Sequence, residues 1–343
     1  LMRTRLDPLV QPGIVSAHTH IFGGSNRVTA DANFASITAA DCTTAPITID
    51  KSLYWAPILY YKDEQSKYHV MSGDGLVTYW FYHIGKDDPD SFPELPDDFR
   101  MVAGDMKRNS LDLSRAPDQA VTFQCFGPGY SMRLPYIPAD FECETIRPQV
   151  SFPNCWDTKN AYKSDNSHVA YGEGDYMYGK CPPGFKRIPT LFLETVYKPA
   201  LMLGAKYKWR AGSLVFSYGD NFGLTFHADW MNGFPKGALN KAYDECKNTL
   251  DGQVTSCPYF QKSIQAEPAR DCTVQGNIVN EAVGIQAPLD HLPGNNVEYN
   301  SSALANFPKK PDPAYVEKSK VVKIESANKG TCKSQICQDY SGP

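Results

Sequence analysis

Two histidines, His18 and His20, lie near the start of the chain in a short apolar run. The run follows the turn formers Pro12 and Gly13 and ends at a glycine-rich break at residues 23–25. In an extended segment, alternate side chains point to opposite faces, so the two imidazoles share one face. Adjacent imidazoles suit metal binding or acid–base catalysis. We predict that this segment contributes to a functional site. The alternative is a pair of histidines that are hydrogen-bonded at a strand end.

A Pro-Gly turn before His-x-His also resembles the first barrel strand of metal-dependent amidohydrolases. That superfamily needs regular alternation of strands and helices, a metal-binding lysine or further histidines, and a late aspartate. Here the helical repeats are missing. The other histidines are scattered among β-type stretches: His69, His83, His168, His227 and His291. We do not favour this interpretation.

Composition favours a mainly β protein. The 343 residues include 25 Gly and 26 Pro, 12% are aromatic and 21% are charged. Aromatic runs alternate with turn formers, and residues 236–250 are the one segment with convincing helical spacing. Residues 53–61, 120–125 and 189–197 are predicted to be strands, and Pro57 places the first at an edge or a bulge. In residues 220–233, an extended chain places His227 and Asp229 on one face. We predict a single jelly-roll-like β-sandwich over residues 1–300, with long disulfide-pinned loops and one or a few short helices. Residues 301–343 are predicted to be a polar tail wrapped on this domain.

Net charge and hydropathy argue against a nucleic-acid partner and against a membrane span. The net charge of −4 argues against nucleic acid, because a surface that follows phosphates needs a basic excess. No apolar run approaches the roughly 20 residues of a membrane span. The sequence starts without an apolar leader, so we expect any signal peptide to have been removed or to lie outside it. The sequence does not indicate whether the protein is a monomer or an oligomer.

The cysteines predict an oxidising compartment. Without a Cys-x-x-Cys pair, a zinc ribbon or thioredoxin motif is not expected, and we predict that all ten form disulfides in a secreted protein. They are Cys42, Cys125, Cys143, Cys155, Cys181, Cys246, Cys257, Cys272, Cys332 and Cys337. We expect Cys246–Cys257 and Cys332–Cys337 as local pairs. Cys155 and Cys181 flank a long loop and are expected to help hold it in place. Asn300 begins a glycosylation sequon, which fits secretion.

Several stretches together resemble the fungal secreted family called domain of unknown function 1996. The matching segments, in chain order, fall within residues 5–10, 12–13, 16–25, 54–57, 99–105, 152–160, 167–171, 181–182, 192–194, 219–220, 226–233 and 257–258. The resemblance implies a secreted fungal protein, tied to cell walls or to secretomes that degrade biomass. It does not imply an established reaction. Members often carry a second cysteine near Cys42, so the resemblance implies that Cys42 pairs elsewhere.

The matching segments contain more polar side chains than packing requires. Because buried single charges are costly, we predict that these residues converge in one cleft, where they shift one another's pKa values. The residues are His18, His20, Asp105, Asp157, Lys159, His168, Glu194, Asp220, His227, Asp229 and Asn232. Trp156 is predicted to be a stacking platform for a sugar ring. The alternative is that Trp156 fills the core over the Cys155 disulfide and that the polar groups only fix loops.

These residues favour a glycan-active enzyme that acts on a cell-wall polysaccharide. Two of Asp157, Glu194, Asp220 and Asp229 would flank a glycosidic bond as acid and base or nucleophile. In a lyase, a histidine or lysine such as His227 or Lys159 would abstract a proton from a uronic acid. One alternative is a non-catalytic wall protein that binds glycan. Another is a divalent-metal site on His18, His20 and His227.

Overall fold

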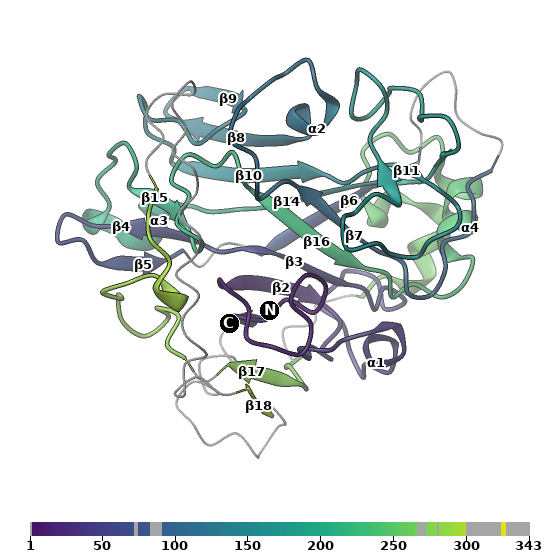
Figure 1. Ribbon diagram of the computed structural model, residues 1–343, viewed down its shortest axis with the longest axis horizontal. Helices are drawn as coiled ribbons and strands as arrows, with labels where there is room; N and C mark the ends of the chain where they lie inside the picture. The colour runs from purple at the N-terminus through teal and green to yellow at the C-terminus, as the bar shows by residue number, and fades with distance from the viewer. Residues whose placement is uncertain are drawn as a thin grey trace.

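The computed structural model describes residues 2–71, 75–82, 91–265, 272–279, 281–299 and 324–326. Two five-stranded antiparallel sheets form the body of the protein, one above the other in Figure 1. The first sheet has the order β1 (Met2–Thr4), β2 (His20–Gly24), β3 (Leu53–Pro57), β16 (His227–Met231) and β7 (Arg100–Gly104). The second has the order β6 (Leu76–Phe81), β14 (Thr190–Thr195), β10 (Thr145–Ser151), β8 (Val121–Gly127) and β9 (Tyr130–Leu134). The predicted mainly β fold is confirmed.

The main hydrophobic core lies between the two sheets. Strand residues alternate between faces, so every second side chain of each sheet enters this core. Trp230 of the first sheet meets Trp80 of the second, with ring centroids 5.3 Å apart, and both are buried. The other face of the first sheet is also buried, because Phe22 and Trp55 pack there against Leu6 of the N-terminal segment. This second buried face positions the candidate site.

Smaller elements surround the two sheets. One three-stranded sheet has the order β12 (Val169–Ala170), β11 (Cys155–Trp156) and β13 (Lys186–Arg187), and another has β15 (Leu214–Phe216), β4 (Leu59–Lys62) and β5 (Tyr68–Val70). The helices are α1 (Phe34–Thr38), α2 (Ala116–Gln119), α3 (Pro199–Leu203) and α4 (Ala238–Cys246). None of the helices in the described part of the chain could span a membrane.

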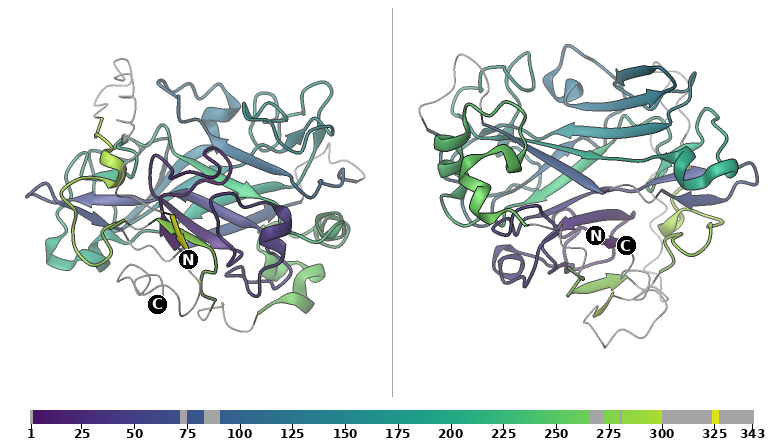
Figure 2. Two further views of the ribbon diagram at one scale, coloured as in Figure 1. Left: turned by 60° about the horizontal axis from the view of Figure 1, so that its bottom comes forward. Right: turned by 180° about the vertical axis from the view of Figure 1, so that it is seen from behind.

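The structure corrects one local prediction, the extent of a helix, and adds detail to two others. The aromatic run at residues 53–61 is two strands, because the chain leaves the first sheet at Pro57 and Ile58 donates its backbone N–H to Thr19. The helix predicted at residues 236–250 is only α4, and Leu250 is exposed. The tail contributes a strand, because β18 (Ile324–Ser326) pairs with β17 (Asn277–Val279), close to the N-terminal strands in Figure 2.

Four disulfides join the described cysteines, as predicted. They are Cys42–Cys272, Cys125–Cys143, Cys155–Cys181 and Cys246–Cys257. The expected local pair Cys246–Cys257 is therefore confirmed, and Cys155 and Cys181, which were expected to help hold the loop between them, bond to each other. Cys332, Cys337 and Asn300 lie outside the described residues.

Candidate metal centre

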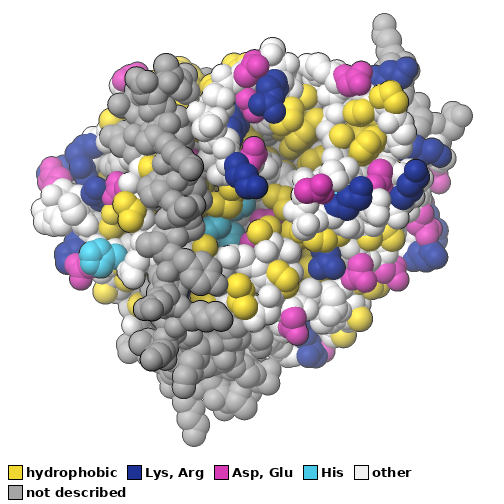
Figure 3. Space-filling model, viewed as in Figure 1, with side chains coloured by type: hydrophobic (Ala, Val, Ile, Leu, Met, Phe, Trp, Pro, Cys, Tyr) yellow, Lys and Arg dark blue, Asp and Glu magenta, His cyan; other side chains and the backbone are white. Residues whose placement is uncertain are grey.

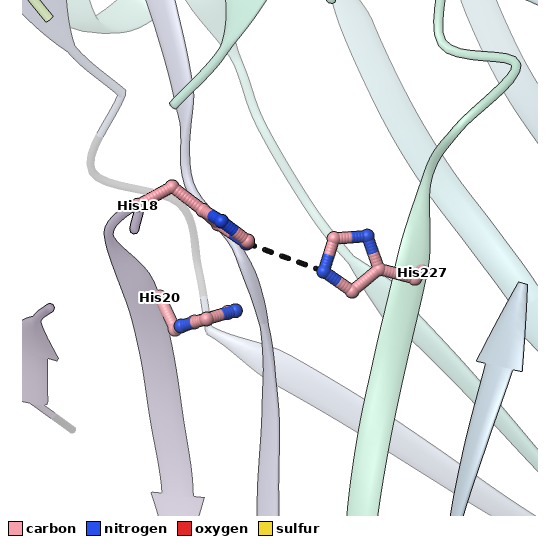
Figure 4. A group of neighbouring side chains, drawn as sticks. All are labelled: His18, His20 and His227. Atoms are coloured by element: carbon pink, nitrogen blue, oxygen red, sulfur yellow. Dashed lines mark hydrogen bonds between the residues drawn. The ribbon is translucent and has the colours of Figure 1, made fainter. Parts of the chain in front are cut away.

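Three histidines from two segments that are far apart in sequence converge on one point (Figure 4). The Nε2 atoms of His18 and His227 are 3.2 Å apart. One ring nitrogen from each of His18, His20 and His227 lies within 4.8 Å of the other two, and all three side chains are buried. The structure thus joins both histidine-containing segments that the sequence singled out.

The register of the first sheet explains this convergence. His20 of β2 pairs with Pro57 of β3, and Asp229 of β16 pairs with Trp55. In the same antiparallel register, His227 of β16 lies opposite Pro57 of β3. Pro57 thus has His20 on one side and His227 on the other. The two histidines thus flank one strand, with Cα atoms about 10 Å apart across two strand spacings. The His20 and His227 rings approach each other with centroids 6.0 Å apart, and His18 joins them just before β2.

Backbone carbonyls orient two of the three rings. The Nδ1 atom of His20 lies 2.9 Å from the carbonyl oxygen of Leu6, and Nδ1 of His227 lies 3.1 Å from that of Thr225. A carbonyl only accepts, so each Nδ1 carries the proton and each Nε2 keeps its lone pair. The buried Nε2 of His20 has no hydrogen-bond partner among the described residues. Metal-binding histidines typically donate their second nitrogen to a carbonyl in this way.

The distance between two of the three histidine nitrogens matches the spacing that a tetrahedral metal ion requires. A tetrahedral Zn²⁺ bound at about 2.0–2.1 Å holds its nitrogen ligands about 3.3 Å apart. The His18–His227 separation of 3.2 Å matches this spacing. Imidazole ligands suit Zn²⁺, Cu²⁺, Fe²⁺ and Ni²⁺. Among the described residues, no Cys, Asp, Glu or further His belongs to the group. Three protein ligands leave one tetrahedral position for a water molecule or a substrate.

Tyr218 is a neighbour of the cluster that sequence reasoning missed. Its ring centroid lies 5.2 Å from that of His18 and 5.4 Å from that of His227. Its position next to Gly219-Asp220, a matching segment, was the one available signal. Asp220 itself does not face the histidines, because its carboxylate accepts bonds from the backbone N–H groups of residues 222, 223 and 225 and from the Thr225 hydroxyl. Asp220 therefore shapes the turn that leads into β16.

Asp229 lies two residues from His227, on the same face of β16. It is fully buried, and neither carboxyl oxygen has a hydrogen-bond partner among the described residues. Burial, followed by the nearby charge of Asp7, raises the pKa of Asp229 well above its ordinary range. Burial also raises the pKa of Asp7. Asp229 is thus a fully buried carboxyl group two residues along β16 from His227, and its predicted catalytic role stays a prediction.

The predicted stacking platform and its neighbours form a separate structural unit. Trp156 is only 5% exposed, packs edge-on against Phe99, and donates its indole N–H to the carbonyl of Asn160. It fills the core beside the Cys155 disulfide, so the prediction of a surface platform is wrong. Asp157 accepts backbone bonds from Lys159 and Asn160, which lowers its pKa despite some desolvation. Lys159 is exposed.

His168 also belongs to this unit rather than to the cluster. Its backbone carbonyl accepts the N–H of Asp157, and its Nε2 bonds to the carbonyl of Arg100 at 2.8 Å. Arg100 pairs with Met231, four residues along β16 from His227, which is a distance of about 13 Å along a strand. His168 and Asp157 are therefore not brought into one site with the histidine cluster.

Three further candidates are also elsewhere. Glu194 is on β14 of the second sheet, where it bonds to residues of that sheet. Asp105 directly follows β7 and is exposed. Asn232 caps a turn after β16, with its side-chain oxygen accepting the N–H of Phe234. The predicted single cleft is thus wrong as a whole, although three of its four histidines, His18, His20 and His227, do meet.

The cluster lies close to the surface. His18 is 4% exposed and His227 is 3% exposed, whereas His20 is fully buried. Figure 3 shows histidine side chains near the centre of one face, in a hollow among hydrophobic and acidic side chains. Access is therefore narrow and suits an ion or a small protruding group.

The buried state of His20 predicts an acid-sensitive fold in metal-free protein. Burial lowers the pKa of His20 to about 3. Below pH 6.5 the unfolded chain binds a proton that folded His20 does not. The free energy of unfolding therefore decreases as the pH is lowered. Linkage gives a loss of about 3 kcal/mol between pH 7 and pH 4.5. His20→Asn keeps an N–H for Leu6 and should remove this loss, as measured by urea unfolding in EDTA at both pH values. Equal pH dependence in the two proteins would contradict it.

Comparison with known proteins identifies the family but supplies no activity. The family model described as "Domain of unknown function (DUF1996)" matches residues 7–234. This range is more than half of the chain, so the chain belongs to that family, and it includes all three histidines of the cluster. Neither the curated proteins nor the solved structures contain a match.

Proposed function

We propose that this member of the DUF1996 family is a secreted, metal-dependent hydrolase that acts on cell-wall or biomass glycans. The observation that carries the proposal is the convergence of three histidine nitrogens without a fourth protein ligand among the described residues. Closed four-ligand sites are typical of structural zinc, whereas three ligands and an open position are typical of catalytic zinc.

The chain's own residues supply the positioning. Leu6 and Thr225 fix the rings of His20 and His227 through their carbonyls. The buried sheet holds both histidines without loop freedom, which favours a preorganised site. A Zn²⁺ ion in such a site would lower the pKa of a bound water molecule to about 7 and thereby provide a nucleophile at neutral pH.

A metal-dependent reaction fits this geometry better than a two-carboxylate glycosidase. Retaining and inverting glycosidases place two carboxyl groups on opposite sides of one bond, within about 5–10 Å. Here Asp157 is in the loop after β11, Glu194 is on the second sheet, and Asp229 is buried behind the histidines. The choice of a glycan substrate rests on the sequence resemblance and on four disulfides that suit an extracellular protein.

Activity should require both the metal and the cluster. We expect the purified protein to release sugars or acyl substituents from at least one of a panel of fungal and plant wall polysaccharides. EDTA should abolish the release, and Zn²⁺ or Cu²⁺ should restore it. His227→Ala should lose at least 100-fold in rate, because it removes one metal ligand. Release that persists in EDTA, or in the variant, would contradict the proposal.

The low exposure of the cluster favours one second candidate, a non-catalytic wall protein with a structural metal. Replacement of the metal by Co²⁺ separates the two candidates. An open position should accept azide and change the visible absorption spectrum of bound Co²⁺. A spectrum that azide does not alter, in a protein that binds glycan without releasing products, would favour the structural role.

A further inference from the structure

A second surface, on the outer face of the second sheet, carries aromatic rings that core packing does not use. Tyr79 and Phe81 of β6 and Phe192 of β14 are each partly exposed. The centroid of the Tyr79 ring lies 6.4 Å from that of Phe81 and 5.7 Å from that of Phe192. None of the three belongs to the hydrophobic clusters that the described residues form. The rings therefore form a small aromatic patch that faces outward.

A buried acid lies beside this patch. Glu194 is only 3% exposed although it projects from the outer face of β14. One of its carboxylate oxygens accepts from Gln149 at 2.8 Å, and the other accepts from the Tyr79 hydroxyl and the Arg147 guanidinium at 3.3 Å each. The carboxylate thus ties one ring of the patch to two polar side chains of β10.

The hydrogen-bond network continues across the sheet. The Thr122 hydroxyl of β8 donates to the side-chain oxygen of Gln149 at 3.1 Å. Arg133 of β9 donates from Nε to the Thr122 hydroxyl at 3.0 Å. The network therefore crosses all five strands from β6 to β9, which follow one another toward the top of Figure 1. Four strand spacings make it about 19 Å long.

We propose that this outer face is a binding surface for a neutral polysaccharide chain that lies across the strands. Its accessible groups are Tyr79, Phe192, Arg147 and Thr122, and the buried Glu194 and Gln149 beneath them hold these side chains in place. A pyranose ring has a flat apolar face that stacks on an aromatic ring, and its hydroxyl groups bond to fixed polar groups at its edge. The patch and the network supply these two elements side by side.

Charge and order both favour this ligand. Arg147 pairs with Glu194 and stacks over the ring of Phe126 at 5.0 Å. The acid at the centre is thereby balanced. The one further charge of the network, Arg133, is on β9 at the end away from the aromatic patch, so the aromatic end of the face offers little attraction to a strongly charged partner. The side chains already hold one another in place, which reduces the ordering entropy that a ligand must overcome. A shallow, preordered face that combines rings with hydrogen-bonding groups suits a neutral glycan better than an apolar protein segment.

This surface is separate from the histidine cluster. The cluster is on the first sheet, on the face turned away from the core between the sheets. Glycan binding at the second sheet therefore does not depend on a metal, and it would hold regardless of the reaction at the cluster.

Binding to insoluble polysaccharides tests the surface. Protein in EDTA is incubated with cellulose, chitin, β-1,3-glucan and xylan, and the bound fraction gives a dissociation constant. We expect the wild-type protein to bind at least one of them, although EDTA removes any metal from the histidine cluster. Tyr79→Ala and Phe192→Ala should each weaken binding about tenfold, because each removes a stacking surface. Tyr178→Ala is the matched control, because Tyr178 is a 63% exposed aromatic residue outside the patch, and it should bind like wild type.

Three outcomes would overturn the proposal. The first is that the wild-type protein binds none of the four polysaccharides. The others are that Tyr79→Ala and Phe192→Ala bind as tightly as wild type, or that Tyr178→Ala loses as much affinity as they do. Retention on albumin-coated beads that matches retention on polysaccharide would mark an apolar protein-docking face instead. If an alanine variant does not fold, Tyr79→Leu keeps the buried volume and should still lose about tenfold in affinity. Failure of sugar release in EDTA does not affect this test, so the two proposals fail independently.

Discussion

Replacing His227 with alanine should abolish the stabilisation that a divalent transition metal gives to the wild-type protein. The metal binds the folded chain through three converging nitrogens, and the unfolded chain has no such arrangement. At a metal concentration 100 times the dissociation constant, this difference adds about 2.7 kcal/mol to the free energy of unfolding. The variant loses one ligand and should show a shift near zero at the same concentration.

Thermal unfolding with and without Zn²⁺ or Cu²⁺ measures this effect. Each variant is compared with its own metal-free form, so any cost of the substitution to the fold cancels. His291→Ala is the matched control, because His291 is an exposed histidine outside the cluster. It should keep the full wild-type shift. A shift of wild-type size in His227→Ala, or an equal loss in His291→Ala, would show that the metal binds elsewhere.

Removal of the Cys42–Cys272 disulfide should cost about 5 kcal/mol of stability. This bond closes a loop of 230 residues, and in the chain-entropy model the stabilisation grows with loop length. The segment that Cys272 begins has other ties to the N-terminal part of the chain. Gln275 donates its backbone N–H to Asn26, the Asn26 side chain donates to Thr273, and Val274 packs on the N-terminal hydrophobic cluster.

The Cys246–Cys257 pair provides the control for this prediction. Its sequence separation is only 11, for which the same model gives about 3 kcal/mol. Double alanine variants of the two pairs are compared by urea unfolding under identical conditions. We expect the long-loop variant to lose more stability than the short-loop variant. A smaller loss for Cys42→Ala/Cys272→Ala would contradict the entropic account of this bond.

Local sequence patterns predicted the parts of the fold that local physics determines. Alternating apolar residues marked β14 and β8, and spacing marked α4. The strand change at Pro57 was predicted only as an edge or a bulge, because the choice of sheet depends on long-range partners such as Thr19. The end of α4 depends on the Cys246 disulfide and on what its last turn contacts, neither of which periodicity reveals.

The candidate site shows the same limit. The spacing of His18 and His20, and the strand pattern around His227, predicted that each segment presents its polar side chains on one face. The meeting of the two segments depends on β3 lying between them, which no local pattern contains. The single-cleft prediction failed because it treated every costly polar residue as part of one site. Asp220 and Asp157 instead organise turns through their own backbone, and Glu194 belongs to another face.

Direct observation of the metal tests the central claim most sharply. A crystal of the protein grown with Zn²⁺ should give one strong anomalous peak at the zinc absorption edge. We predict that this peak lies about 2.0–2.1 Å from the Nε2 atoms of His18, His20 and His227, with one non-protein ligand completing a tetrahedron. No peak at the cluster at saturating Zn²⁺, with the His18 and His227 nitrogens still in direct contact, would contradict the assignment of a metal centre.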